Sequence, residues 1–159
     1  MEASARNMKS VADPAVLESL KHRFAALTPG SERRWGTLTA HEMVCHIADS
    51  SDMILKTRPR TLPSPVKPRF LFKFVGLWTP IRWPHGWRTN PRLDPRVAGT
   101  KPSEFLADRT RALVGLDALA RAEKGSLEHV HGVFGSMSTR DWQRFAFKHT
   151  DHHLRQFGV

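Results

Sequence analysis

Cysteine and long apolar runs are nearly absent from this chain, and each absence excludes a class of protein. Because Cys45 is the only cysteine, the chain cannot form an internal disulfide. The N-terminal stretch MEASARNMKS lacks the apolar core of a secretory signal peptide, so we expect a reducing, cytoplasmic setting. The most apolar run, FLFKFVGLW, is far shorter than the ~18 apolar residues of a membrane span and includes Lys73. No transmembrane segment is therefore expected.

Acidic residues are also scarce relative to basic ones. The sequence has 25 Lys and Arg against 15 Asp and Glu, a formal net charge of +10. This excess favours anionic partners such as nucleic acid, an acidic membrane surface or a carboxylate-bearing small molecule. Part of it lies in residues 56–96, where it is spread along a proline-rich segment and not along one helical face. Nucleic acid is therefore the less expected partner, and a small-molecule substrate the more expected one.

The apolar pattern predicts an all-α protein that forms one domain over residues 1–159. Asp13 precedes a proline at the first helical position, Thr39 and Glu42 have capping-box spacing, and Ser138 starts the last helical pattern. After each start signal, apolar side chains recur at helical spacing. The predicted helices cover residues 13–28, 39–58, 102–124 and 138–159. Four helices in this order favour a four-helix bundle.

Residues 58–100 are too many for a short connection between two helices. They hold most of the prolines and three of the five tryptophans of the chain. Because the phenylalanines and tryptophans of this insertion should be at least partly buried, we expect it to pack over one end of the bundle. The aromatic side chains of its stretch FKFVGLWTPIRWPHGW either pack against the bundle in a purely structural role or form a wall and lid of a pocket for an apolar or aromatic substrate.

The C-terminal stretch KHTDHHLRQFGV carries three of the nine histidines. At about 100° per residue, His149 and His153 share the side of the last helix that Trp142 and Phe145 turn toward the core. His152 lies about 100° away, toward the edge of the bundle or the solvent. Because buried imidazoles need partners, His149 and His153 are the stronger candidates for a functional site.

Helix 39–58 offers a third inward imidazole. His46 shares its side with two methionines, whereas His41 lies about 140° away and is expected on the surface. Three neutral imidazoles from two helices could bind a divalent metal and leave a fourth coordination position for water or substrate. Spacing alone also allows a structural role, in which each histidine hydrogen-bonds a neighbour. Cys45 projects away from His46 and is expected to be a core residue.

Two stretches, LTAHEMVCHIADS and KHTDHHLRQFGV, resemble the motifs of the DinB-like (YfiT-like) superfamily of four-helix metalloproteins, in a branch without an assigned function. In that family, a histidine in an H-x-x-D context on the second helix joins an H-x3-H pair on the last helix to hold a divalent metal. The resemblance implies a metal site at His46, His149 and His153, with Asp49 beside it. It also implies a DinB-like bundle, and we expect zinc or nickel as the metal.

Relatives in this superfamily include transferases of low-molecular-weight thiols, such as bacillithiol, mycothiol or glutathione, and metal-dependent hydrolases. The resemblance therefore implies a metal-dependent enzyme, with two reactions open. In the first, which we favour, a metal-bound thiolate attacks an electrophilic small molecule while Arg33, Arg34 or Arg155 holds the carboxylates of the thiol. In the second, a metal hydroxide attacks an amide or ester, and a carboxylate or His152 moves protons.

Other interpretations stay open. Asp49, one turn after His46, is either an acceptor for a ligand imidazole or a water-orienting group, or it is an exposed residue in an ion pair. The aromatic and basic surface could instead make the chain a peripheral membrane or nucleic-acid binder. Related bundles often dimerise, so the resemblance also implies a homodimer.

Overall fold

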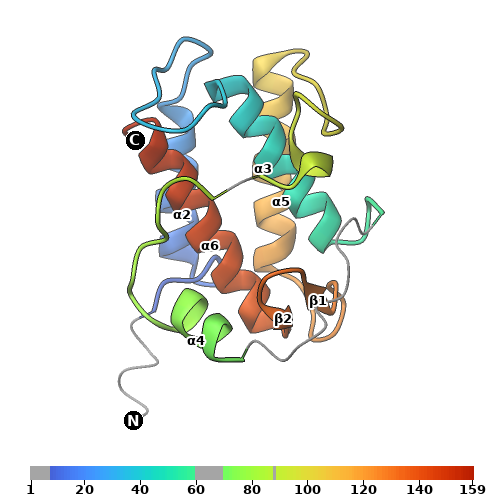
Figure 1. Ribbon diagram of the computed structural model, residues 1–159. Coiled ribbons are helices and arrows are strands. Elements are labelled where there is room, and N and C mark those ends of the chain that lie inside the picture. The colour runs from blue at the N-terminus through green and yellow to red at the C-terminus, as the bar shows by residue number, and fades with distance from the viewer. Residues whose placement is uncertain (1–7, 60–69, 88) are drawn as a thin grey trace.

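The computed structural model describes residues 8–59, 70–87 and 89–159, and these are mostly helical (Figure 1). Its α-helices are α2 (Pro14–Ala25), α3 (Ala40–Ile54), α4 (Phe70–Trp78), α5 (Phe105–Ala120) and α6 (Thr139–Gln156). The other elements are a 3-10 turn, η1 (Pro91–Leu93), and an antiparallel hairpin of β1 (Val130–His131) and β2 (Gly135–Ser136). The prediction of a helical protein is confirmed, whereas α4, η1 and the hairpin are elements that the sequence pattern did not indicate.

The helices begin where the sequence places its capping residues. The side chain of Asp13 accepts a backbone hydrogen bond at the start of α2. The pairs Thr39–Glu42 and Ser138–Asp141 form reciprocal capping boxes at the starts of α3 and α6. These side chains satisfy amide groups that have no partner within the helix, so each start is determined locally. The ends of the helices depend less on neighbouring residues. For example, α3 ends at Ile54, whereas the sequence predicted an end at residue 58.

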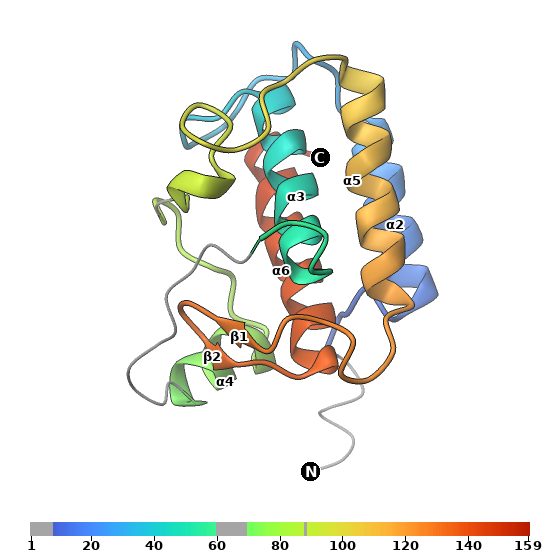
Figure 2. The ribbon, with the colours of Figure 1, turned by 90° about the vertical axis from the view of Figure 1, so that its right-hand side faces the viewer.

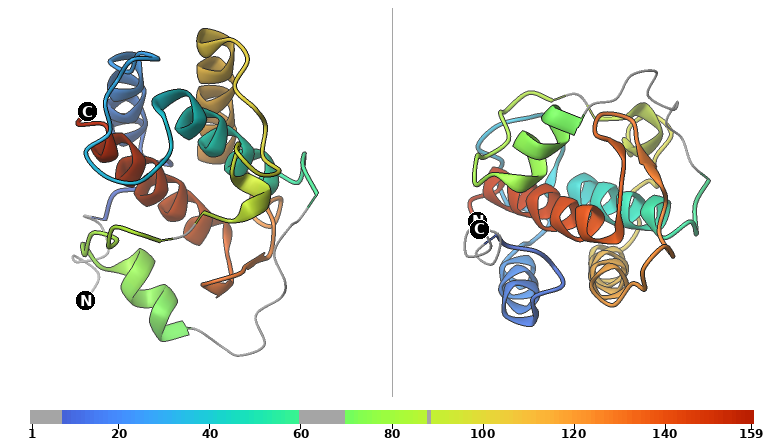
Figure 3. Two further views of the ribbon diagram at one scale, coloured as in Figure 1. Left: turned by 45° about the horizontal axis from the view of Figure 1, so that its top comes forward. Right: turned by 90° about the horizontal axis from the view of Figure 1, so that it is seen from below.

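Four of the helices pack against one another around an apolar core. α3 packs along α5, and α2 contacts both α5 and α6, as Figures 2 and 3 show from three directions. Large, fully buried side chains of this core come from all four helices: Leu20, Phe24, Ile47, Leu116 and Trp142. Their removal from water supplies the main driving force for this arrangement. It holds α3 beside α6, the two helices that carry the candidate histidines.

The carboxylate of Asp49 joins three separate parts of the chain. It is completely buried on α3 and accepts hydrogen bonds from the Thr100 backbone at 2.7 Å and the Thr100 hydroxyl at 2.6 Å. It also forms an ion pair with Arg58 at 2.7 Å and another with Arg111 of α5. Arg58 and Thr100 are the two ends of the segment 58–100, so this one carboxylate closes the base of the insertion against the helices.

Within the segment 58–100, residues 60–69 and 88 lie outside the described part of the chain. Leu77 and Trp83 are buried as expected, and α4 packs against α6. The expected burial of the phenylalanines is wrong for α4, where Phe70 is 75% and Phe74 is 56% exposed. The physical reason is that Lys73 and Lys148 hold the opposite side of this helix to the protein through hydrogen bonds. Among the described residues, no helix is both long and apolar enough to cross a membrane.

The Asp49 ion pairs predict a large and specific effect on stability. Asp49→Asn removes the charge that Arg58 and Arg111 share in a buried position, and such a loss costs about 3 kcal/mol or more of the free energy of unfolding. Asp52→Asn is the matched control, because Asp52 also pairs with Arg111, at 2.8 Å, but is partly exposed. That change should cost less than about 1 kcal/mol. Urea unfolding of the two variants measures both values, and equal losses would contradict this account of the insertion.

Candidate metal centre

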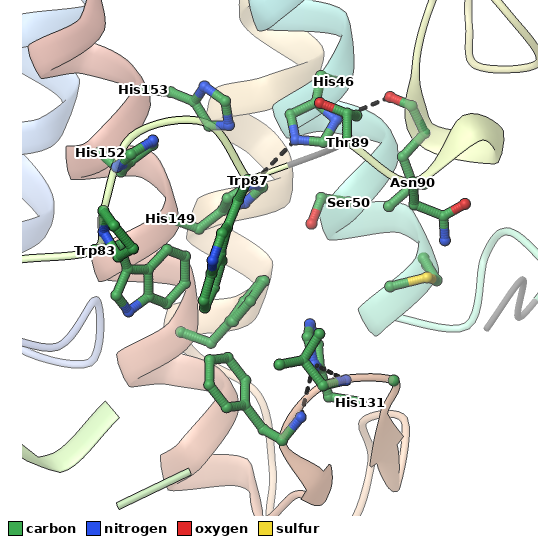
Figure 4. Close-up of a pocket in the computed structure, with 17 residues that line it drawn as sticks. His46, Ser50, Trp83, Trp87, Thr89, Asn90, His131, His149, His152 and His153 are labelled. Atoms are coloured by element: carbon green, nitrogen blue, oxygen red, sulfur yellow. Dashed lines mark hydrogen bonds between the residues drawn. The ribbon is translucent and has the colours of Figure 1, made fainter. Parts of the chain in front are cut away.

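Three imidazoles from two helices converge at one side of the core. His46 projects from α3, and His149 and His153 project from successive turns of α6, as Figure 4 shows. The Nε2 atoms of His46 and His149 are 3.0 Å apart, and ring nitrogens of all three side chains lie within 4.8 Å of one another. The predicted convergence of His46, His149 and His153 is therefore confirmed, and the group could hold a metal ion.

The protonation of His46 is determined by the chain. Its Nδ1 atom lies 2.8 Å from the Leu93 carbonyl oxygen. A carbonyl oxygen only accepts hydrogen bonds, so Nδ1 carries the proton and donates it to Leu93. The proton is then absent from Nε2 in the neutral ring, and its lone pair faces the other two histidines. A backbone carbonyl on the outer nitrogen is a common arrangement for a metal-bound histidine.

His153 is oriented by a relay of two hydrogen bonds. The Gln156 amide nitrogen donates to the Trp35 carbonyl oxygen at 2.7 Å, and this contact determines which way the amide group points. The Gln156 oxygen therefore faces His153 Nδ1, at 3.0 Å, and accepts its proton. As in His46, the Nε2 lone pair of His153 is left available. Gln156 lies three residues after His153 on α6, so its side chain reaches the outer nitrogen of that ring.

One nitrogen–nitrogen separation in the cluster is close to that expected for a tetrahedral metal site. Histidine nitrogens bind zinc at about 2.0–2.1 Å, which places two ligand nitrogens roughly 3.3 Å apart in a tetrahedral site. The 3.0 Å separation between the Nε2 atoms of His46 and His149 is close to this value. With the Nε2 of His46 unprotonated, that short contact needs either a proton on His149 or a cation between the two nitrogens. The residues present therefore fit a divalent metal ion.

The cluster is neutral at physiological pH. Burial lowers the pKa of His46, and burial together with the charges of neighbouring imidazoles lowers the pKa of His149 and His153 well below their ordinary value. Protons therefore compete weakly for the three nitrogens near pH 7, which leaves them free for a metal.

A cavity of about 340 Å³ opens directly beside the three histidines. Four large aromatic side chains line it: Trp83, Trp87, Phe134 and Phe145. Figure 4 shows the two tryptophans beside the histidines. Ser50 and Asn90 contribute polar atoms on the opposite side. No Asp, Glu, Lys or Arg is found among the described residues that line it. The prediction that the segment with Trp83 and Trp87 walls a pocket agrees with this lining.

His131 is a residue of this cavity that sequence reasoning missed. It lies on β1, and its Nδ1 atom accepts hydrogen bonds from the backbone amides of Val133 and Phe134, at 3.0 and 3.2 Å. Burial lowers its pKa to about 4, so the neutral ring carries its proton on Nε2. In Figure 4 the other ring nitrogen points from the hairpin toward the histidine cluster. No local motif marks this residue, because its position depends on the unpredicted hairpin.

His152, which was expected at the edge of the bundle or in the solvent, is partly buried. Its ring packs edge-on against Trp35, with 6.0 Å between ring centroids, and burial lowers its pKa to about 4. Within the described part of the chain, its buried Nδ1 atom has no hydrogen-bond partner. Together with His153, the ring lies between the aromatic cavity and a second cavity of about 380 Å³. The second cavity is more polar and includes Asp94 and Arg96 in its lining.

The other predicted site residues lie away from the aromatic cavity. Arg33 is exposed and donates to the Gly36 carbonyl at 3.1 Å, and Arg34 is also exposed. Arg155 pairs with Asp151 at 2.9 Å and lines a different cavity on the outer side of α6. Among the described residues, none of these three arginines lines the cavities beside His153.

Asp49 is not a partner of a cluster imidazole, and it forms the ion pairs of the alternative prediction, although it is buried and not exposed. Its carboxylate is engaged by Thr100, Arg58 and Arg111, and the acceptor for the outer nitrogen of His46 is the Leu93 carbonyl instead. The reason is geometric, since one helical turn separates Asp49 from His46 and α5 supplies a cation on the side that Asp49 faces. The expectation that Asp49 sits at the metal site is corrected accordingly.

A second group of possible ligands lies on the other side of α3. His41 is partly buried rather than on the surface, and its Nε2 atom is 2.8 Å from the Asp108 carboxylate, which also accepts from the Ser103 amide. Cys45, buried as predicted, completes the group, and burial and the charge of Asp108 raise the pKa of its thiol to about 12. The thiol is therefore protonated, and the three side chains satisfy one another as a structural contact between α3 and α5.

Comparisons with known proteins found no match, neither among protein-family models nor among curated proteins nor among solved structures.

The histidine geometry predicts the metal content of the purified protein. Untagged wild-type protein prepared without nickel resin, incubated with zinc and freed of excess ion, should retain about one metal per chain. His153→Ala removes one of three ligands and should abolish retention, measured by elemental analysis. His152→Ala and the exposed-histidine control His22→Ala should retain the metal. Equal retention in all four proteins would show that the cluster is not the binding site.

His131 predicts a specific dependence of stability on pH. Its pKa is about 4 in the folded protein against 6.5 ordinarily, so the unfolded chain takes up the proton first as pH falls. The stability that it contributes is complete above pH 6.5 and is lost between 6.5 and about 4. In His131→Gln, the free energy of unfolding should depend less steeply on pH in this window, by up to about 1.4 kcal/mol per pH unit.

Urea unfolding with chelator present, at several pH values within that window, measures the slope. His22→Gln serves as the control, because His22 is exposed and its replacement should leave the slope of the wild type. An unchanged slope in the His131 variant would mean that its ring is protonated in the folded protein as readily as in the unfolded chain.

Proposed function

We propose that the protein is a metal-dependent enzyme that transfers a low-molecular-weight thiol, such as glutathione or bacillithiol, to an apolar or aromatic electrophile. The observation that carries this proposal is the position of three convergent imidazoles at the wall of an aromatic cavity. In the same proposal, α2, α3, α5 and α6 form a single-domain, DinB-like four-helix bundle, and the metal is zinc or nickel.

A zinc or nickel ion held by His46, His149 and His153 would act as a Lewis acid that favours the thiolate form of a coordinated thiol at neutral pH. The chain itself orients the imidazoles that would hold the metal. Leu93 and Gln156 hold the outer nitrogens of two of these rings, so their inner nitrogens keep one direction. Pre-organised positioning of this kind lowers the entropic cost of bringing two reactants together.

The lining of the aromatic cavity suits an apolar or aromatic electrophile. Trp83 and Phe145 offer ring faces on which an aromatic substrate could stack, and they exclude water from it. His131 offers an N–H donor for an electronegative atom of the substrate. Among the described residues, no carboxylate lines this cavity to serve as a general base. A metal-coordinated thiol needs no such base, because coordination alone favours loss of its proton.

The second cavity offers a place for the polar part of the thiol. Glutathione-type thiols carry carboxylates. Among the described residues, Arg96 is the arginine or lysine that lines this cavity, and its guanidinium pairs with Asp94 at 2.7 Å. Because His153 lines both cavities, one ligand can reach the metal from this side while the electrophile occupies the other. Arg96 therefore replaces Arg33, Arg34 and Arg155 as the proposed binding residue.

One observation keeps hydrolysis as a second candidate function. His152 lies beside the cluster with a buried Nδ1 atom that lacks a partner. In a metal-dependent hydrolase of a small amide or ester, this nitrogen could exchange a proton with the attacking water or the leaving group. The two reactions differ in substrate and in their dependence on an added thiol.

Thiol-adduct formation with chlorodinitrobenzene tests the proposal. In this reaction the sulfur bonds to the ring carbon and chloride leaves, which can be followed by absorbance. Zinc-loaded wild-type protein should accelerate the reaction of glutathione or bacillithiol, and His153→Ala should lower kcat/KM about 10- to 100-fold. His22→Ala should match the wild type.

Nitrophenyl esters, offered without thiol, test the alternative in parallel. Hydrolysis that His153→Ala abolishes, with no thiol adduct in any protein, would replace thiol transfer by metal-dependent hydrolysis. Metal retention without either reaction would overturn the proposed function while leaving the metal site in place.

A further inference from the structure

Helix α4 turns its apolar side to the solvent. Five large apolar residues of this nine-residue helix are exposed, from 41% at Val75 to 75% at Phe70. Four of them cover an arc of roughly 140° around the helix: Phe70, Leu71, Phe74 and Val75. Clusters of large apolar side chains on a protein surface mark sites of interaction with a partner or a membrane.

The orientation of α4 is held by polar contacts on its inner side. Lys73 donates to the Ser136 carbonyl at 2.7 Å and pairs with Asp141 at 3.1 Å. Lys148 of α6 donates to the Gly76 carbonyl at 2.7 Å and to two carbonyls that follow α4. A rotation that buried the phenylalanines would break these bonds and leave buried groups unpaired. The outward position of the apolar face is therefore built into the fold.

The apolar surface extends from α4 to the mouth of the aromatic cavity. The Phe72 ring stacks beside the Trp87 ring, with 6.2 Å between the centroids. Trp87 is 45% exposed and also lines the cavity, so it belongs to both surfaces. Ile81, in the loop after α4, is exposed as well. Figures 2 and 3 show that α4 lies on the opposite side of α6 from α5.

The charge of the protein is concentrated in the sequence around this helix. Residues 53–93 contain no Asp or Glu, and they contain nine Lys and Arg, whereas the rest of the chain is nearly balanced. The nine are Lys56, Arg58, Arg60, Lys67, Arg69, Lys73, Arg82, Arg88 and Arg92. Arg58 and Lys73 pair with Asp49 and Asp141, and residues 60–69 and 88 lie outside the described part of the chain, so Lys56, Arg82 and Arg92 are the described cations that are exposed. Almost the whole net charge of +10 thus belongs to the segment that also presents the exposed phenylalanines.

We propose that α4 and the exposed cations next to it in the chain, such as Arg82, bind the surface of an anionic lipid membrane. The apolar arc would enter the boundary between headgroups and acyl chains, and the cations would contact lipid phosphates. A helix of nine residues is too short to span a bilayer and suits this interfacial position.

The apolar arc and the cations together favour a membrane over other partners. Nucleic acid would account for the cations but not for an aliphatic and phenylalanine-rich arc, and a second copy of this basic chain would bring like charges together. The proposal does not depend on the metal-dependent reaction.

Co-sedimentation with phosphatidylcholine vesicles, with and without phosphatidylglycerol, tests the proposal. Full-length protein should bind the anionic vesicles, less so in high salt. Phe70→Glu with Phe74→Glu should lower the partition coefficient at least tenfold. Arg82→Glu, at an exposed position outside the metal centre, should lower it at least severalfold, because it removes one positive charge near the surface and adds a negative one.

Matched controls lie on α5, where Leu106 and Val114 are 57% and 61% exposed. Leu106→Glu with Val114→Glu adds the same charge on a different face and should bind vesicles nearly as well as the wild type. Unaltered thermal unfolding would show that each variant is folded.

Three results would overturn the proposal. The first is the absence of binding to anionic vesicles. The second is equal loss of binding in the α4 and α5 variants. The third is a wild-type dimer in light scattering that the Phe70 and Phe74 changes convert to a monomer, because the apolar arc would then be an interface between two copies. Retention on oligonucleotides that needs Arg82 but not the phenylalanines, without vesicle binding, would assign the surface to nucleic acid instead.

Discussion

A carboxylate buried in the middle of α3 requires partners, and the partners that Asp49 takes arrange much of the molecule around it. Arg58 and Thr100 close the two ends of the long insertion, while Arg111 ties the same point to α5. Closing the insertion there brings η1 against α3, one turn from Asp49. The Leu93 carbonyl then meets the outer nitrogen of His46. An ion pair that takes no part in the chemistry thus helps to orient a candidate ligand.

The candidate metal centre has polar groups on its outer side and apolar groups on its inner side. Leu93 and the relay from Trp35 through Gln156 hold the imidazoles from outside, and aromatic rings face them from inside. Low polarity around the cluster keeps the histidines neutral, which is the state in which they bind metals. His152 differs from the three cluster histidines. Its buried Nδ1 atom has no hydrogen-bond partner among the described residues, and its ring lies between two cavities of different polarity.

The insertion unites the apolar cavity with the exposed surface of α4. Trp87 belongs to both, and the Phe72 ring connects it to the helix. If the surface rests on a membrane, the mouth of the cavity lies near the region where apolar molecules accumulate. The cavity could then take up an aromatic substrate from the membrane that the α4 surface contacts. The proposals for the cavity and for the surface rest on separate observations.

By itself, the sequence determined the features that depend on neighbouring residues. Capping residues and apolar spacing predicted the starts of α2, α3 and α6, and helical periodicity placed His149 and His153 on one side, facing the core with His46. Periodicity relates residues within one helix, so such predictions need no knowledge of the rest of the chain. Tertiary structure alone decided the partners of Asp49, the position of His131 and the burial of His41, because each depends on contacts between distant segments. It also decided the exposure of α4, where lysines hold the helix by its polar side and override the usual expectation that phenylalanine is buried.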